Sequence, residues 1–324
     1  MTNDQIRTFF RNNPALNLKQ IEIEAGIPNT YLNKAMKGRN LSEEHIKKVA
    51  PILIRYGFKD NEGAKVYAIY NHKGGVGKTT TSVNLAVGLA NKNFKVLLID
   101  FDPQANTTQH LGYRGEDRPT NTIRNVLTFD EANNLPIKSC IYQPYEDLDT
   151  FHLIPSELSL TKIARDLTLR QIPGMERLSK VLGMVKQDYD YILLDTPPNM
   201  DILVTNAMVA AHSVIIPVIP DSLPYEGLAD VIDFVKDETT LRLNPDITVE
   251  GILLTMVKGN TALHQSIEEK IRSKFSRYKV FDTKIRNTIA LSEASEAGED
   301  IFSYSHRSNA AKDYKSFTEE LING

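Results

Sequence analysis

Cysteine is almost absent from this chain of 324 residues, which contains only Cys140. A single cysteine can neither form an intramolecular disulfide nor build a metal site alone. Folds stapled by intramolecular disulfides and metal centres built from cysteine alone are therefore excluded. Cys140 is expected to be a packing residue, and the composition fits a reducing cytoplasm.

Long apolar runs are also missing, because no stretch approaches the ~20 residues that span a bilayer. The first ten residues are polar and charged, so we expect no secretory signal and no membrane segment. The formal net charge of −3 argues against a protein coated in basic residues, although it leaves room for a local nucleic-acid face. The hydrophobic fraction of 41% and charged fraction of 24% indicate an ordinary globular protein. The length suits one large domain and a small one.

The first 60 residues indicate a separate, small all-α domain. Apolar residues at 18–25, a glycine-proline turn and a second helical stretch at 30–36 resemble a helix-turn-helix. A further helix is predicted over residues 43–56, with Ser42 as its N-cap.

This helical domain (1–60) carries a mild basic excess and is expected to end at the polar stretch 59–63. Residues 1–63 contain 10 Lys and Arg against 7 Asp and Glu. The basic turn at 37–40 suits phosphate contacts and favours DNA over the alternative, a protein-docking module. The candidate DNA contacts are Asn29, Thr30, Asn33 and Lys34.

A glycine loop at residues 73–80 is the most informative motif in the chain. It follows an apolar run at 66–70 that predicts a strand, and it precedes a helical pattern at 81–89. A strand, a glycine loop and a helix start form a phosphate cradle, because backbone N–H groups and the helix dipole point at the anion. The predicted nucleotide-binding residues are Lys73, Gly74, Gly75, Val76, Gly77, Lys78, Thr79 and Thr80.

Within this loop each polar residue has an expected role. Lys78 would reach the β- and γ-phosphates, Thr79 would hold Mg²⁺ through its hydroxyl, and Thr80 could bind an inner phosphate. The general P-loop pattern begins with a glycine where this chain has His72, and it lacks the additional lysine, Lys73.

Carboxylates end two other apolar runs. The run 95–100 ends in Asp100 and is followed by Asp102, whereas the run 191–195 ends in Asp195 before a Thr-Pro-Pro turn. Buried carboxylates need a cation or hydrogen-bond donors, and a Mg²⁺–nucleotide would supply them. The Thr-Pro-Pro loop could sense the γ-phosphate. The predicted metal-site residues are Thr79, Asp100 and Asp195.

Further predicted strands at 213–217 and 251–257 alternate with helical stretches, and several strands are apolar on both faces. This pattern predicts an α/β fold in which a mostly parallel sheet lies between two helical layers. Ligands bind at the carboxyl ends of such strands, where all these motifs fall.

Together the motifs at 73–80, 100–104 and 194–198 resemble those of the ParA/MinD group of deviant Walker-A ATPases, and most closely those of ParA, the DNA-partition ATPase. The resemblance covers residues 64–324, which we predict to be one P-loop ATPase domain. Further agreement lies at 215–218, 225–228, 284–286, 291–294 and 310–314.

The resemblance implies an ATPase that uses Mg²⁺ and an ATP-dependent homodimer. Lys73 would cross the sandwich dimer to the partner's phosphates, Asp102 would position the attacking water, and Asp100 would lie nearer the metal. In-line attack on the γ-phosphate needs such positioning and charge neutralisation. Pro220 and Asp221 correspond to the region where this family holds adenine.

A basic segment at 270–286 carries seven Lys and Arg residues against Asp282 alone. Ile267, Ile271 and Phe275 form an apolar stripe, which predicts a helix whose basic residues face outward. The resemblance implies a surface that binds DNA without sequence preference, through counterion release; a merely solvated helix face is the alternative. The candidate DNA contacts are Lys258, Lys270, Arg272, Lys274 and Arg277.

We therefore expect a cytoplasmic, nucleoid-associated ATPase of DNA segregation whose hydrolysis is stimulated by a ParB-like centromere-binding partner. The N-terminal domain would bind an operator and repress the partition genes. An ATP-switched transcriptional regulator stays open. A MinD-like membrane-cycling ATPase is disfavoured because residues 317–324 are short and acidic. A relative of the nitrogenase iron protein would need more cysteines.

Overall fold

The computed structural model describes residues 3–14, 16–56, 63–220, 224–258 and 262–323. The chain divides into two compact units, Met1–Gly63 and Ala64–Gly324, and each is described by itself. Among these described residues, no helix is both long and apolar enough to cross a membrane.

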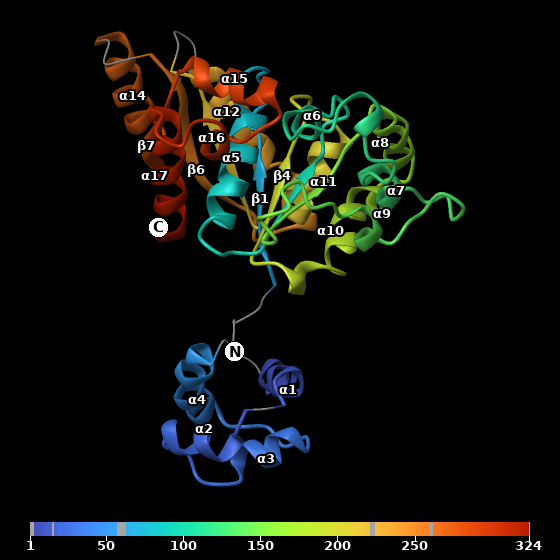
Figure 1. Ribbon diagram of the computed structural model, residues 1–324, viewed down its shortest axis with the longest axis vertical. Coiled ribbons are helices and arrows are strands. Elements are labelled where there is room, and N and C mark those ends of the chain that lie inside the picture. Colours follow the sequence, from blue (N-terminus) through green and yellow to red (C-terminus); the bar gives the residue numbers. More distant parts are fainter. Residues whose placement is uncertain (1–2, 15, 57–62, 221–223, 259–261, 324) are drawn as a thin grey trace. The chain divides into compact units, whose positions relative to one another are not determined.

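The N-terminal unit is all-helical. Its helices are α1 (Asn3–Asn12), α2 (Leu18–Glu24), α3 (Tyr31–Met36) and α4 (Glu43–Arg55) (Figure 1). As expected, the Ser42 side chain caps α4 by accepting a hydrogen bond from the His45 N–H. Sequence analysis assigned no element to α1, which packs onto the others through Ile6 and Phe10.

The larger unit contains a seven-stranded sheet in the order β3-β2-β4-β1-β5-β6-β7, and every pair of neighbours is parallel. The strands are β1 (Lys65–Ile69), β2 (Val96–Asp100), β3 (Phe151–Ile154), β4 (Tyr191–Asp195), β5 (Ser213–Val218), β6 (Thr248–Val257) and β7 (Val280–Arg286). The predicted parallel α/β fold is thus confirmed.

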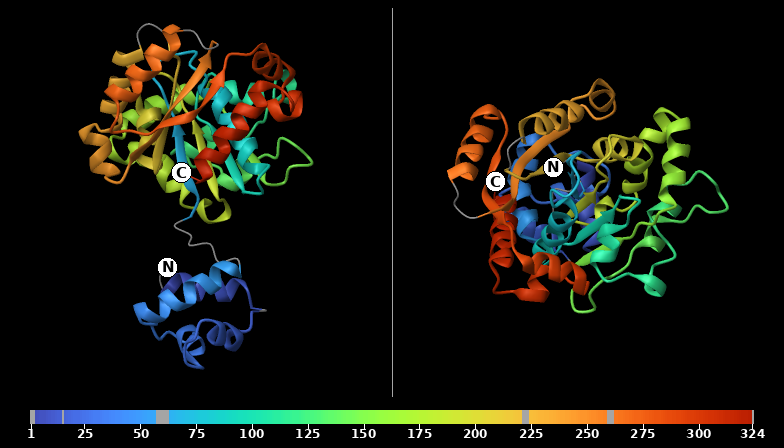
Figure 2. Two further views of the ribbon diagram at one scale, coloured as in Figure 1. Left: turned by 90° about the vertical axis from the view of Figure 1, so that its left-hand side faces the viewer. Right: turned by 90° about the horizontal axis from the view of Figure 1, so that it is seen from above.

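Helices cover both faces of this sheet (Figures 1 and 2). One face packs against α7 (Ile123–Leu127), α8 (Leu160–Leu169), α10 (Arg177–Leu182), α11 (Ile202–Ala210), α12 (Pro224–Val235) and α14 (Ala262–Lys274). The other packs against α5 (Lys78–Ala90), α15 (Ile289–Ala297), α16 (Ile301–Ser305) and α17 (Asn309–Asn323). Short segments complete the unit: α6 (Asn106–His110), α9 (Ile172–Met175), α13 (Glu238–Leu243), η1 (Gly115–Asp117), η2 (Ile137–Cys140) and η3 (Lys186–Asp188).

Sequence analysis did not assign β3 or β7 to strands. These two form the edges of the sheet, where a strand has only one neighbour. In β7, buried Phe281 and Ile285 alternate with charged residues, so that the strand resembled part of a basic surface segment. The central strands are apolar on both faces, so their sequences indicated strands more clearly.

Candidate functional site

The glycine loop (residues 73–80) connects the end of β1 to the start of α5. Gly75 and Gly77 adopt left-handed φ angles of 71° and 84°, which glycine reaches without steric cost. Gly77 is the N-cap of α5, so the positive end of the helix dipole faces the loop. The loop lines a hollow of about 500 Å³ together with Asp102. Two predicted motifs, more than twenty residues apart, therefore share one cavity.

Lys78 is buried and turned toward its own loop. Its Nζ donates hydrogen bonds to the carbonyl oxygens of Asn71 at 2.9 Å and Lys73 at 3.0 Å. Burial lowers the pKa of Lys78, and the charges of Asp195 and Asp102 oppose that shift. An entering phosphate can replace the two carbonyl contacts with a charge-assisted pair.

Asn71, which sequence analysis missed, holds the start of the loop. Its side chain donates to the Pro217 carbonyl oxygen at 2.8 Å and accepts from the Lys73 N–H at 2.9 Å. Asn71 thereby ties the glycine loop to β5. Lys73 itself is exposed.

Asp195 is fully buried at the end of β4 and accepts three hydroxyl hydrogen bonds. The donors are Thr79 Oγ1 at 2.8 Å, Ser82 Oγ at 2.9 Å and Thr107 Oγ1 at 2.7 Å. Burial raises the pKa of Asp195, and these hydroxyls oppose the shift. Two predicted metal-site residues, Thr79 and Asp195, are thus in direct contact. Ser82 and Thr107 were not predicted; Ser82 follows Thr79 by three residues on α5, so the two lie on one helix face.

Asp100 lies beside Asp195, because the β2–β4 register pairs the two residues. Its carboxylate accepts hydrogen bonds from the Thr108 N–H at 2.8 Å and from Thr108 Oγ1 at 2.6 Å. Complete burial, together with the Asp195 charge, raises the pKa of Asp100 to about 8. A divalent cation nearby would stabilise both ionised carboxylates.

The oxygen donors of this region fit Mg²⁺. Thr79 offers a hydroxyl, Asp195 and Asp100 offer carboxylates, and Mg²⁺ prefers few protein oxygens plus phosphates and water. The described residues hold no cluster of three or more His, Cys, Asp or Glu side chains arranged as a metal cage. A metal shared with nucleotide phosphates does not need such a cage.

Asp102 is 7% exposed and lines the same hollow as Lys78. Its Oδ1 accepts a hydrogen bond from the Gln104 N–H at 2.9 Å, which orients the carboxylate. Burial raises the pKa of Asp102, and the Gln104 N–H and the Lys78 charge act against the increase. The carboxylate can therefore accept a hydrogen bond from a water molecule in the hollow.

A second hollow of about 290 Å³ adjoins the first, and both are lined by Gly77, Thr80, Met256 and Ser295. The ends of β6 and β7 and the start of α15 form its other walls. The Thr288 hydroxyl on this wall is buried and has no hydrogen-bond partner among the described residues. Thr255 Oγ1 donates to the Val76 carbonyl oxygen at 2.8 Å and fixes the wall to the glycine loop. The sequence motifs did not indicate this hollow.

The predicted adenine residues lie elsewhere in the chain. Pro220 is buried, two residues beyond β5, and Asp221 lies outside the described residues. Their assignment to adenine stays a prediction.

His110 also lines the first hollow and gives a prediction for acid stability. Its ring is 2% exposed, and burial lowers its pKa from 6.5 to about 4. The unfolded chain therefore binds an additional proton between these values, so His110 costs folding stability as pH falls from 6.5 toward 4. Between pH 7 and pH 5 the free energy of unfolding falls by about 2 kcal/mol for this reason.

The His110→Gln variant should accordingly be less sensitive to acid. Urea unfolding at pH 7 and pH 5 measures the decrease in stability, and we expect it to be about 2 kcal/mol smaller than in the wild type. His306→Gln, at an exposed histidine, is the control and should behave as wild type. An unchanged pH dependence in His110→Gln would contradict the assignment.

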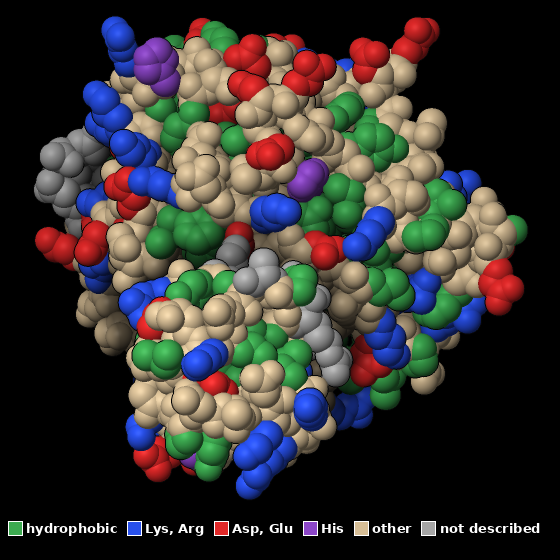
Figure 3. Space-filling model, turned by 60° about the horizontal axis from the view of Figure 1, so that its bottom comes forward, with side chains coloured by type: hydrophobic (Ala, Val, Ile, Leu, Met, Phe, Trp, Pro, Cys, Tyr) green, Lys and Arg blue, Asp and Glu red, His purple; other side chains and the backbone are tan. Residues whose placement is uncertain are grey.

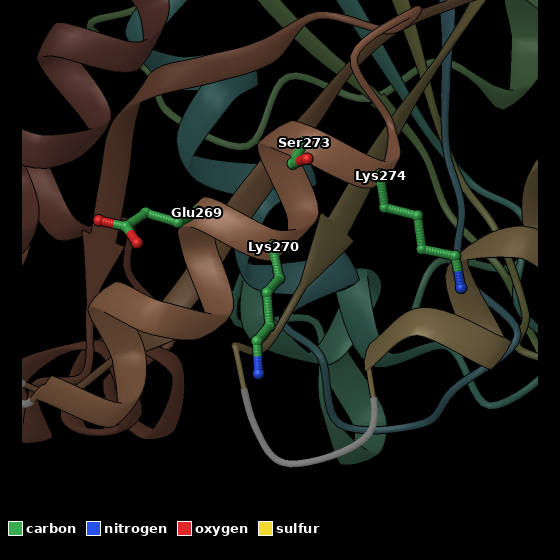
Figure 4. A pocket seen from close by; sticks show the side chains of 4 residues that line it. All are labelled: Glu269, Lys270, Ser273 and Lys274. Atoms are coloured by element: carbon green, nitrogen blue, oxygen red, sulfur yellow. The ribbon is translucent and has the colours of Figure 1, made fainter.

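The predicted basic helix is α14. Its lysines and its arginine, Arg272, have different surroundings. Lys270 and Lys274 extend from one side of the helix, whereas Glu269 points away from them (Figure 4). Lys270, Lys274 and Arg277 are exposed, as is Lys258 at the end of β6.

Arg272 instead binds to the protein itself. Its guanidinium donates to the carbonyl oxygens of Val280 and Phe281, both at 2.9 Å, and pairs with Glu268 at 3.1 Å. Two other cations of the basic segment, Lys284 and Arg286, lie on β7 rather than on the helix. Lys284 pairs with Glu268, and Arg286 pairs with Asp313. Arg272 therefore ties α14 to β7, and its role in DNA contact stays a prediction.

One face of the molecule illustrates how charges of both signs are mixed (Figure 3). On the face shown in Figure 3, Lys and Arg side chains are scattered among acidic and hydrophobic ones. A nucleic-acid surface would thus be local, as the net charge indicates.

In the N-terminal unit, the four predicted DNA contacts are exposed at the start of α3: Asn29, Thr30, Asn33 and Lys34. Buried Glu22 on α2 fixes this start, because its carboxylate accepts hydrogen bonds from the N–H groups of Thr30 at 2.9 Å and Leu32 at 2.7 Å. Arg7 donates to the Gly38 carbonyl oxygen at 3.2 Å and so holds the basic turn after α3.

Residues of the larger unit are similar in sequence to known proteins. The family model described as an AAA domain matches residues 64–249. The sporulation initiation inhibitor protein Soj of Bacillus subtilis is 38% identical over 257 residues, which cover 79% of this chain and 98% of Soj. The chromosome partitioning protein ParA of Myxococcus xanthus is 35% identical, over 80% of this chain and 88% of its own length.

Solved structures show the same fold. A plasmid partition protein of Borrelia burgdorferi bound to AMPPNP has a TM-score of 0.63 at 28% identity, covering 80% of this chain and 97% of that protein. Cobyrinic acid a,c-diamide synthase of Mycobacterium smegmatis, with a bound ATP analogue and magnesium, has a TM-score of 0.66 at 25% identity, covering 80% and 95%.

Proposed function

Because this chain belongs to the ParA/Soj family of partition ATPases, it hydrolyses ATP with Mg²⁺, and we propose that it does so as a DNA-binding homodimer that segregates a replicon. The supporting observation is the convergence of Lys78, Thr79 and Asp102 on one hollow at the carboxyl edge of the sheet, where Thr79 donates a hydrogen bond to buried Asp195. These residue types supply what phosphoryl transfer to water requires: a phosphate cradle, a metal site and an acceptor for the attacking water.

Each residue of the site has a proposed part in hydrolysis. The loop N–H groups and Lys78 bind the phosphates, and Thr79, oriented by Asp195, contributes its hydroxyl to the metal site. Bound Mg²⁺ would neutralise phosphate charge. Asp102 orients the attacking water. Lys73 is exposed at the start of the loop, and its side chain would extend to a second copy of the chain and touch the partner's phosphates.

We further propose that the nucleoside enters the second hollow. Phosphates in the glycine loop leave the sugar and base on the side of Gly77 and Thr80, where the two hollows meet. The Thr288 hydroxyl, which has no partner among the described residues, offers a hydrogen bond to a polar group of the ligand.

Binding to DNA without sequence preference is proposed for the exposed lysines of α14, and operator binding is proposed for α3 of the N-terminal unit. A ParB-like partner would stimulate hydrolysis and release the DNA, and the ATP-bound dimer would associate with the nucleoid. The exposed polar residues at the start of α3, fixed by Glu22, support an operator-reading surface.

The DNA surface can be tested by replacing Lys270 and Lys274 with glutamine. We expect weaker ATP-dependent retention of arbitrary duplex. The slope of log affinity against log salt should decrease in magnitude by about 0.9 for each DNA phosphate that the variant no longer neutralises. Basal ATPase activity should not change, because both lysines lie outside the nucleotide hollows. Salt-dependent fluorescence anisotropy measures the retention.

A matched control replaces Lys162 and Arg165, two exposed cations of α8 on another part of the unit, by glutamine. Equal weakening by both pairs would show that net charge, rather than the α14 surface, governs retention. Full retention in the Lys270/Lys274 variant would contradict the proposal.

The same DNA titration distinguishes the proposed partition ATPase from an ATP-switched transcriptional regulator. Such a protein should prefer one operator whether or not ATP is present, and it should gain little affinity for arbitrary duplex when ATP is added.

A further inference from the structure

The end of β6 carries a backbone irregularity at the boundary between the two hollows. In the pairing of β6 with β7, Leu254 lies opposite Lys284 and Val257 lies opposite Arg286, so β6 has one residue more than β7 between these pairs. This register shift is a bulge-like irregularity, called the bulge below; such features change the direction of a side chain and are common beside functional sites.

Met256 lies within this bulge and has a φ angle of 51°. Left-handed backbone is uncommon for any residue with a Cβ atom and is an outlier for a bulky side chain. Such conformations persist where the surrounding structure holds them, often at ligand sites. Here the preceding residue, Thr255, is held by its hydrogen bond to the Val76 carbonyl oxygen of the glycine loop.

The bulge places the Met256 side chain over the glycine loop. A Cβ atom built on Gly77 would lie 3.9 Å from the Met256 methyl carbon, Cε. Met256 lines the phosphate hollow and also the adjoining hollow, so its thioether lies where the two meet. An unbranched, polarisable thioether adapts to the shape of an apolar ligand surface.

We propose that Met256 is an apolar contact for the nucleoside part of the nucleotide: it packs against the sugar and base and makes no contribution to phosphate binding. This inference rests on the proposed placement of the phosphates in the glycine loop and of the nucleoside in the second hollow. The strained bulge is what brings an apolar side chain to this boundary.

The test compares two ligands that differ only by the nucleoside. Mg²⁺–ADP and Mg²⁺–pyrophosphate are titrated calorimetrically into the full chain and into Met256→Ala, so that no turnover occurs. We expect the Kd for ADP to rise about tenfold, as for the removal of one partly buried apolar side chain, and the Kd for pyrophosphate to stay within about twofold of wild type.

Two further variants separate the side-chain contact from backbone strain. Met256→Gly removes both the side chain and the left-handed strain, so it should weaken ADP binding as Ala does while its Tm equals or exceeds that of Met256→Ala. Met256→Leu keeps the apolar volume and should bind ADP nearly as the wild type does. Thermal unfolding without ligand establishes that each variant is folded.

Unchanged ADP binding in Met256→Ala would overturn the inference, and so would an equal weakening of ADP and pyrophosphate binding, which would mean that Met256 acts by shaping the glycine loop. If the wild-type chain binds pyrophosphate but gains nothing from the nucleoside, the inference fails while the phosphate cradle stands. If it binds neither ligand, the proposed nucleotide site itself fails.

Discussion

Lys78→Ala is expected to abolish nucleotide binding, with affinity reduced by at least about 100-fold. The Lys78 ammonium is buried and already makes two hydrogen bonds to carbonyl oxygens of its own loop. Phosphate would replace these contacts with a stronger charge-assisted interaction, whereas alanine leaves the phosphate charge without its cation. Calorimetric titration with Mg²⁺–ADP measures the change in affinity.

The matched control is Lys73→Ala, which makes the same substitution five residues earlier in the same loop. Its exposed side chain is proposed to act in a partner's site, so ADP binding by the monomer should stay near wild type while ATP-dependent dimerisation and turnover fall. Near-normal ADP affinity in Lys78→Ala would refute the phosphate cradle. A Tm close to wild type in both variants would show that the differences do not come from unfolding.

Asp102→Ala should keep ATP binding and ATP-dependent dimerisation while turnover falls about 100-fold or more. The carboxylate lies in the phosphate hollow, oriented by the Gln104 N–H, and no described hydrogen bond connects it to the glycine loop. Its removal should therefore affect the attacking water rather than the bound nucleotide. Single-turnover hydrolysis and size-exclusion chromatography with ATP measure the two properties.

Asp102→Asn tests the carboxylate charge separately from the side-chain shape. An asparagine oxygen can still accept the Gln104 N–H, so the loop should keep its conformation, yet turnover should fall nearly as far as with alanine. Turnover at the wild-type rate in either variant would exclude Asp102 from the hydrolytic step.

The sequence was sufficient to predict the parts of the site that follow buried strands. Asp100 and Asp195 end apolar runs, and parallel strands bring their carboxyl ends to one edge, so their proximity follows from the fold class. Ser82, Thr107 and Asn71 carried no comparable signal. A hydroxyl or amide side chain indicates a site only when its hydrogen-bond partner is known. Each of these three residues has such a partner far away in the sequence.

The basic segment also shows that the sequence alone could not predict every contact of a side chain. Counting cations in residues 270–286 gave a marked local excess, but three of those cations are engaged by Glu268, Asp313 or backbone carbonyls. Two of the acceptors lie outside the segment, so a local count of charge could not detect them. The tertiary structure leaves the lysines of α14 as the more accessible part of this surface.

The glycine loop is held at two points: Asn71 links its start, at Lys73, to β5, and Thr255 links its middle, at Val76, to β6. Its conformational entropy is therefore given up when the protein folds rather than when the ligand arrives. A nucleotide meets a rigid receptor, and its association rate should be limited by diffusion and by the exchange of the Lys78 carbonyl contacts. In the proposed homodimer, the encounter of two chains would then add a step whose rate depends on protein concentration, whereas ordering of the loop would add none.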